Sequence, residues 1–87
     1  GPNLGITVAE IMTGIVITRV DESGAARRRL RAGDMILKAN GRNVRTLSEL
    51  NAVLRRVRRG GRVYFRILRK LPKRKKPAKL NVSIIVK

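Results

Sequence analysis

The chain has 87 residues, 43% of them hydrophobic, which is enough for one domain with one small core. It contains no cysteine and no histidine, which excludes a disulfide framework, a thiolate metal site and a Ser-His-Asp triad within these residues. The formal net charge of +17 permits binding to a polyanion, an acidic peptide or a membrane surface.

The charge is divided unevenly along the chain. Residues 1–49 contain all five acids and eight basic residues, whereas residues 50–87 contain 14 basic residues and no acid. No apolar run approaches the roughly 20 residues of a membrane span, and no signal peptide is visible. The opening Gly-Pro is typical of a cleaved expression tag. We therefore expect residues 1–3 to be tag remnant or linker, and residues 4–87 to be a single domain of a longer parent.

The first predicted elements are two strands and a short helix. The segment 4–11 begins with an apolar-Gly-apolar triplet and continues with alternating side chains, which predicts a strand over Ile6–Ile11. A second strand, Ile15–Val20, is apolar on both faces for most of its length, so we expect it at the centre of a sheet. Ser23 can cap a short helix over Gly24–Leu30.

The middle of the chain contains two turn signals around a strand. Glycine and aspartate at 33–34 favour a turn, and the short apolar run Met35–Ala39 after it is long enough for one buried strand. Asn-Gly at 40–41 is a strong signal for a two-residue hairpin, with a return strand to Val44. We interpret Asp34 as a turn residue and not as a catalytic acid, because no partner lies near it in the sequence.

A capping box marks the second predicted helix. The Thr46 hydroxyl can accept from the Glu49 N–H while the Glu49 carboxylate reaches back to Thr46, and the helix should then run over Leu47–Arg58. Glycines at 60–61 should end it. Two apolar stripes follow helical spacing, one for the core made by Leu50, Val53 and Val57, and one beside it made by Leu47, Asn51 and Leu54.

Two strands and a basic loop complete the chain. Residues 62–69 alternate, with Val63, Phe65 and Ile67 predicted to point inward, and residues 80–86 form the last strand. Between them, residues 70–79 are too charged and too interrupted by proline for regular structure, so we expect a flexible basic loop. The whole order of strands and helices predicts an α+β fold, with a sheet capped by helices.

The sequence from Gly14 to Arg69 resembles a bacterial PDZ domain, with a short S-x-A-A-like segment followed by L-x-x-G-D-x-I-x-x-x-N-G, a return strand, a capped helix and a strand. The opening LGITVAEI at 4–11 looks most like PDZ domains of the HtrA/protease Do (Deg) family. The departures are Met35, where valine or isoleucine is common, and a third arginine in the short helix.

The resemblance implies a fold and a binding mode. The fold would be a PDZ-like, five- to six-stranded, partly open β-barrel or sandwich capped by two helices, with the bacterial, circularly permuted strand order. An extended peptide would add as a strand beside Ile6–Ile11. The peptide carboxylate would meet the loop formed by Leu4, Gly5 and Ile6, and the groove and pocket would be lined by Thr7, Val8, Ala9, Leu47, Asn51 and Leu54.

The resemblance also implies a role. The domain would be a regulatory or substrate-recognition module of an HtrA-type serine protease, or of an assembly factor derived from one, and would bind C-terminal or unfolded apolar peptide segments. Its parent would be a trypsin-like serine endopeptidase of the bacterial periplasm or cell envelope, either free or membrane-anchored, whose protease domain is a further partner. We expect no catalytic residue, metal or cofactor in this domain.

Two alternatives remain open. The first is a basic domain that binds nucleic acid or an anionic membrane surface through Arg55, Arg56, Arg58, Arg59, Lys73, Arg74, Lys75 and Lys76, although these residues also fit a solvated face. Nucleic acid is disfavoured because Tyr64 and Phe65, which are the aromatic residues of the chain, should point to opposite faces of a strand. The second alternative is a PDZ domain of another envelope protease or of a secretion protein.

Overall fold

The computed structural model describes residues 3–87, so the predicted tag remnant at 1–3 falls mostly outside the described residues. The elements in chain order are β1 (Ile6–Ile11), β2 (Gly14–Val20), β3 (Met35–Ala39), β4 (Arg42–Asn43), α1 (Leu47–Leu54), β5 (Arg62–Arg69) and β6 (Ala78–Ile85). All strand pairs are antiparallel. The predicted strands are confirmed to within one or two residues at each end.

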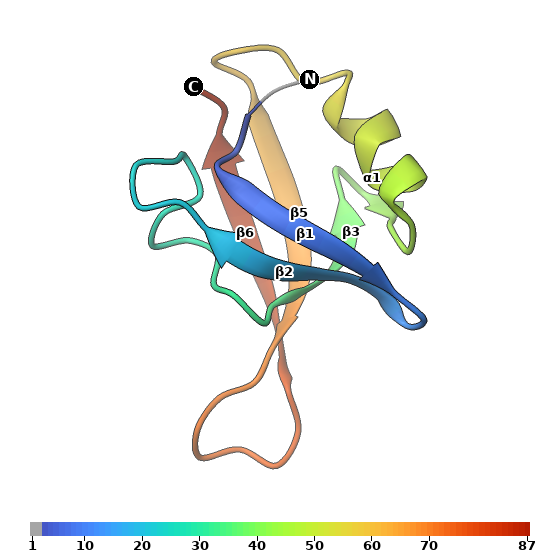
Figure 1. The fold of residues 1–87 in the computed structure, drawn as a ribbon, viewed down its shortest axis with the longest axis vertical. Helices are drawn as coiled ribbons and strands as arrows, with labels where there is room; N and C mark the ends of the chain where they lie inside the picture. The colour runs from blue at the N-terminus through green and yellow to red at the C-terminus, as the bar shows by residue number, and fades with distance from the viewer. Residues whose placement is uncertain (1–2) are drawn as a thin grey trace.

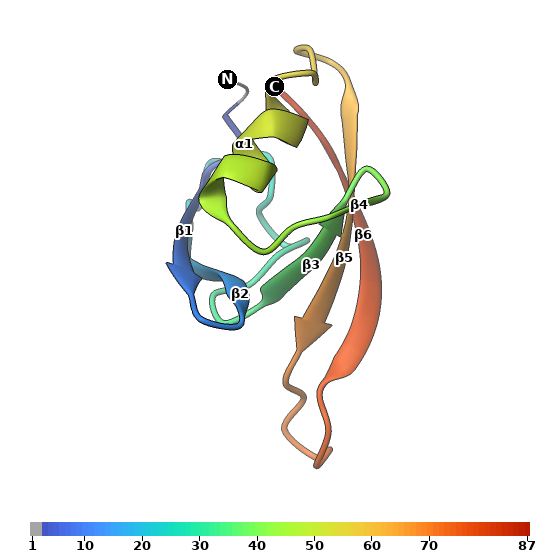
Figure 2. The same ribbon diagram turned by 90° about the vertical axis from the view of Figure 1, so that its right-hand side faces the viewer.

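The strands form one open sheet in the order β1-β2-β3-β5-β6, with the short β4 paired to β3 (Figure 1). In this path β1 pairs only with β2, and β6 pairs only with β5, so these two strands are the edges of the sheet. The sheet curves around α1, which lies on the same side as β1 (Figure 2). The predicted, partly open α+β architecture is confirmed, whereas its circular permutation stays a prediction.

The core lies between the curved sheet and α1. Alternate residues of β5 point inward, and Val63, Phe65 and Ile67 are buried as predicted. They pack with the buried side chains of the other elements, which are Leu4, Ile15, Ile17, Ala26, Leu30, Ile36, Ala39, Val44, Leu50, Val53, Ile84 and Val86. The opposite face of β5 and β6 is left to solvent.

One buried ion pair joins the turn before β3 to the end of β5. Asp34 is 1% exposed, and its two carboxylate oxygens accept from Nε and Nη2 of Arg69 at 2.9 and 2.8 Å. The Arg31 N–H also donates to this carboxylate at 2.8 Å. Hydrogen bonding to Asp34 raises the pKa of Arg69. Asp34 is thus a structural residue, as expected, and its partner lies 35 positions away in the sequence.

The predicted helix over Gly24–Leu30 is wrong. This segment is a series of tight turns in which Arg27 and Arg29 donate three residues back, to Gly24 and Ala26. Arg28 adopts φ +66°, which is outside the helical region. The Ala26 N–H donates to the Leu4 carbonyl, so the segment uses its backbone to hold the chain before β1.

The predicted end of the second helix is also wrong, since α1 ends at Leu54 and not near Arg58. The next N–H groups, those of Arg56 and Val57, bond only three residues back. Four arginines at 55, 56, 58 and 59 repel one another at helical spacing, which disfavours a further turn. The chain instead turns so that the Gly60 N–H can donate to the Val86 carbonyl at 2.7 Å.

Candidate functional site

The free edge of β1 lies beside α1. The helix runs alongside β1 in the opposite direction, from the end of β1 back toward its start (Figures 1 and 2). Because β1 is paired on one side only, the main-chain groups along its other side are available to another extended chain. A β-strand edge next to a helix is a site for strand addition, in which main-chain hydrogen bonds supply affinity and nearby side chains supply selectivity.

The register of β1 with β2 sets which side chains face α1. Val8 lies opposite Ile17, and Glu10 lies opposite Ile15, whose side chains are both buried. Ile6, Val8 and Glu10 therefore share the inner face, and Thr7 and Ala9 share the other. A register shift between Thr7 and Val8 leaves Thr18 of β2 as the extra residue, and its hydroxyl donates to the Thr7 carbonyl at 3.2 Å.

A direct bond ties β1 to the start of α1. The Glu10 carboxylate accepts from the Leu47 N–H at 2.7 Å, across 37 positions of sequence. The first N–H groups of a helix have no partner within the helix, and a carboxylate there also interacts favourably with the helix dipole. Glu10 thus fixes the distance between the end of β1 and the first turn of α1, and no local pattern in the sequence predicts this contact.

The capping box supports the same end of α1 and is confirmed. Glu49 donates its N–H to the Thr46 hydroxyl at 3.1 Å, and its Oε1 accepts from the N–H groups of Thr46 and Arg45 at 3.1 and 3.0 Å. The hydrogen bond from the Arg45 N–H is the largest cause that lowers the pKa of the Glu49 carboxyl. The helix start is held from both sides, by Glu49 of the helix itself and by Glu10 of β1.

The loop before β1 depends on two glycines in contact. Gly5 has φ +72°, and a Cβ built on it would lie 2.6 Å from Cα of Gly24. The Asp21 N–H donates to the Gly5 carbonyl at 2.7 Å. The sequence predicted close backbone approach at Gly5, and the structure shows that the closest neighbour is the backbone of Gly24. This contact could not be seen in either local sequence.

One N–H of the predicted carboxylate loop already has a partner. The Gly5 N–H donates to Oδ1 of Asn3 at 2.8 Å. An amide oxygen therefore occupies the donor that the resemblance assigns to a peptide carboxylate. A carboxylate that bound to the Gly5 N–H would have to displace the Asn3 side chain.

Four of the residues predicted for the peptide site belong to the hydrophobic cluster or pack against it. Leu4 is buried in the core, and Ile6, Val8 and Leu54 are half-buried against it. Thr7 and Asn51 are exposed, Ala9 is half-buried, and Leu47 is 39% exposed. The apolar side chains are thus partly committed to the core, and those of Leu47 and Asn51 at the surface of α1 are open to a ligand.

The predicted anion-binding residues do not form one patch. The arginines 55–59 follow α1 at one end of the molecule, and the basic residues 73–76 lie in the β5–β6 loop at the opposite end of its longest axis (Figure 1). All eight side chains are exposed. Among residues 3–87, no group of His, Cys, Asp or Glu could hold a metal ion. In the same part of the chain, no helix is long and apolar enough to cross a membrane.

A family model described as PDZ domain matches residues 2–85, and the chain therefore belongs to the PDZ domain family. Sixteen chains of solved structures match it. One is described as the crystal structure of the HtrA3 PDZ domain bound to a phage-derived ligand (FGRWV), with a TM-score of 0.74 and 22% identity, over 100% of this chain and 86% of that chain. This likeness supports the fold. No curated protein sequence matches the chain.

Proposed function

We propose that this PDZ domain binds a peptide in extended conformation, as an added strand on the free edge of β1. The observation that carries the proposal is that β1 is an edge strand of the sheet and lies beside α1 (Figures 1 and 2). The HtrA3 PDZ domain, whose fold is similar, is described as bound to a five-residue ligand ending in valine. Membership of the PDZ family adds to this support.

In the proposed complex the peptide runs antiparallel to β1, with its carboxylate near Gly5. Ile6, Val8 and Leu54 contact the last side chain, and Leu47 and Asn51 contact the side chain upstream. A small, partly preformed apolar surface favours aliphatic or aromatic residues at the end of the ligand. A PDZ domain is a binding module, so we assign this domain recognition and no chemistry of its own.

We propose further that the parent is an HtrA-type serine protease, or an assembly factor derived from one, of the bacterial periplasm or cell envelope. The support is the LGITVAEI segment at 4–11 together with the fold of the HtrA3 PDZ domain. In such a parent the domain would deliver substrates to the protease domain or shift that domain toward its active state. A Gly-Asn-Ser-Gly-Gly segment upstream in the parent sequence would support this role, and a parent without a protease domain would contradict it.

A methylation scan of the ligand tests strand addition. A peptide with an apolar C-terminus is titrated after methylation of one backbone nitrogen at a time. Successive N–H groups of a strand point to opposite sides, so binding should be lost at every second position and kept at the positions between. Equal effects at all positions would contradict strand addition. The same variants report which peptide N–H groups face β1.

Amidation of the peptide C-terminus tests the carboxylate site separately. A carboxylate held by main-chain N–H groups makes charge-assisted bonds, so the amide should bind at least tenfold more weakly. Unchanged affinity would contradict carboxylate capture at residues 4–6 and would leave strand addition to the methylation scan. Leu54→Asp should also weaken binding, and Tyr64→Asp on the opposite face of the molecule is its matched control.

A further inference from the structure

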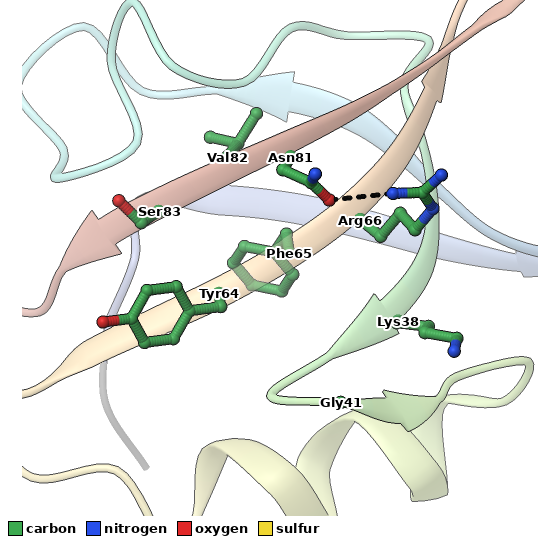
Figure 3. Close-up of a pocket in the computed structure, with 8 residues that line it drawn as sticks. All are labelled: Lys38, Gly41, Tyr64, Phe65, Arg66, Asn81, Val82 and Ser83. Atoms are coloured by element: carbon green, nitrogen blue, oxygen red, sulfur yellow. Dashed lines mark hydrogen bonds between the residues drawn. The ribbon is translucent and has the colours of Figure 1, made fainter.

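The outer face of β3, β5 and β6 carries a row of cations around one exposed tyrosine. In the strand register, Tyr64 lies opposite Ser83, and Arg66 lies opposite both Asn81 of β6 and Lys38 of β3. Residues directly opposite in an antiparallel pair share a face, and Tyr64 is 61% exposed. These residues line a hollow of about 390 Å³, and Figure 3 shows their side chains.

The arginines of this face are held in place without being neutralised. Arg66 donates to Oδ1 of Asn81 at 3.1 Å, and Arg62 donates to the Ser83 hydroxyl at 3.1 Å. These acceptors are neutral, so both positive charges persist. No acid occurs after Glu49 in the sequence. The guanidinium groups are therefore positioned while keeping further donors free for an anion.

Two cations of this face lie directly across from each other. Lys38 and Arg66 are cross-strand partners. Like charges at directly opposite positions destabilise a sheet unless a counter-charge lies between them. An anionic group bound over this pair would relieve the repulsion, so the site is more favourable when occupied.

The loop that connects β5 and β6 is strongly basic, and we call its residues 70–77 the basic finger. It projects beyond the rest of the domain at the end of the long axis (Figures 1 and 2). It contains five cations and no acid, and residues 72–77 are all exposed. Clusters of four to eight Lys and Arg residues are typical of segments that bind anionic lipid surfaces.

We propose that the outer face and the basic finger bind an anionic phospholipid bilayer, with lipid phosphates over Lys38, Arg62 and Arg66. Two side chains on this face suit a bilayer interface, since Tyr64 is amphipathic and Ile85, opposite Arg62, is 51% exposed. Single-stranded nucleic acid fits less well, because it favours several aromatic side chains for successive bases, and Phe65 is buried.

The proposed lipid surface is separate from the proposed peptide site. The sheet curves so that β1 and α1 face the inner side of β5 and β6, and the outer face of β5 and β6 points away from them (Figure 2). A domain attached to a bilayer through this face would leave the β1 edge free. Lipid binding and peptide binding should therefore be independent, and the failure of one proposal would not affect the other.

Sedimentation with vesicles tests the proposal on the 87-residue chain. We expect binding to phosphatidylcholine vesicles that contain phosphatidylglycerol, weakening as salt is raised, and no binding to phosphatidylcholine alone. Lys38→Gln, Arg62→Gln and Arg66→Gln combined should weaken binding about 100-fold, at roughly fivefold for each cation near the surface. Replacing Lys73, Arg74, Lys75 and Lys76 by Gln should have an effect at least as large.

The matched control removes the same charge elsewhere, at three exposed arginines: Arg27 and Arg31 lie between β2 and β3, and Arg42 lies opposite the buried Ala39. It should keep vesicle affinity within about fivefold. Equal losses in the control and the outer-face variant would overturn the proposal, because binding would then depend on net charge alone. Tighter binding to a single-stranded oligonucleotide than to vesicles would also overturn it. Unchanged circular dichroism and peptide titration show that the variants fold.

Discussion

The two edges of the sheet differ in what lies beside them. β1 has six residues, runs along α1, and carries one acid, Glu10, whose carboxylate is bonded to the helix. β6 has eight residues and follows directly after the basic finger. An exposed edge attracts other strands unless charge discourages them, and a second copy of this chain would bring its own +17 to β6. An edge strand therefore becomes a specific peptide-binding site when a neighbouring element, such as α1 beside β1, limits which chains can pair with it.

The largest effect should come from Asp34→Ala, which removes the buried ion pair between the turn before β3 and the end of β5. Breaking a buried ion pair leaves Arg69 without its partner, and we expect a loss of about 3 kcal/mol in the free energy of unfolding. Urea denaturation measures it. Asp21→Ala is the control, because its 3.5 Å pair with Arg19 is exposed and should change stability by less than about 1 kcal/mol.

The next change separates the two edges. In Gly24→Ala the new Cβ would lie 2.7 Å from Cα of Gly5, so the loop before β1 must move. Overpacking of this kind typically costs about 1–3 kcal/mol, and peptide affinity should fall about tenfold while vesicle binding is kept. Ser23→Ala, at the exposed neighbouring position, is the control. Normal peptide affinity in Gly24→Ala would show that the loop plays no part in ligand binding.

A smaller effect of opposite sign is expected from Asn3→Ala. The Asn3 side chain accepts from the Gly5 N–H, so its removal should free that donor for a peptide carboxylate. One hydrogen bond is worth about 1 kcal/mol, and we expect up to fivefold tighter binding in calorimetric titration. An amidated peptide should show no such gain. Weaker binding of the free acid would mean that Asn3 supports the loop and does not compete with the ligand.

The smallest effect is the pH dependence contributed by Glu49. Its pKa is lowered in the folded state from 4.5, chiefly by the Arg45 N–H. The folded chain therefore binds this proton less readily than the unfolded chain, so the stabilisation is present above pH 4.5 and is lost as pH falls through the folded pKa. The difference in unfolding free energy between wild type and Glu49→Gln should shrink with acidification. A difference independent of pH would contradict this assignment.

Local patterns predicted most of the fold and little of its tertiary contacts. Strand alternation located β5 without error, and the Thr46 and Glu49 spacing located the start of α1, because both signals lie within a few residues. The prediction of a helix at 24–30 is wrong because the backbone of this segment makes a hydrogen bond to Leu4, which is remote in sequence. The bonds between Glu10 and Leu47 and between Asp34 and Arg69 also join residues that are remote in sequence, so local patterns do not predict them.

The peptide site stays a prediction of the resemblance, and its residues lie on β1, on α1 and in the segment before β1. The residues that were missed, Gly24 and Glu10, act through distant partners, Gly5 and Leu47. Nothing in a single sequence pairs such positions. The split of the basic residues between two ends of the molecule was hidden for the same reason, since it depends on the direction in which the β5–β6 hairpin projects.

The bond from Glu10 to Leu47 has a consequence for ligand length in the proposed mode. This hydrogen bond joins β1 to α1 at the end of β1 that is farthest from Gly5. It closes that end of the space between β1 and α1 in which the peptide would lie, and the end near Gly5 stays open. A long ligand must lift away from the sheet at this closed end. Peptide residues farther upstream then add no main-chain hydrogen bonds to β1, and a basic side chain at this point would lie near the Glu10 and Glu49 carboxylates. In the proposed mode the domain would thus bind only a short C-terminal segment, whatever the size of the protein to which that segment belongs.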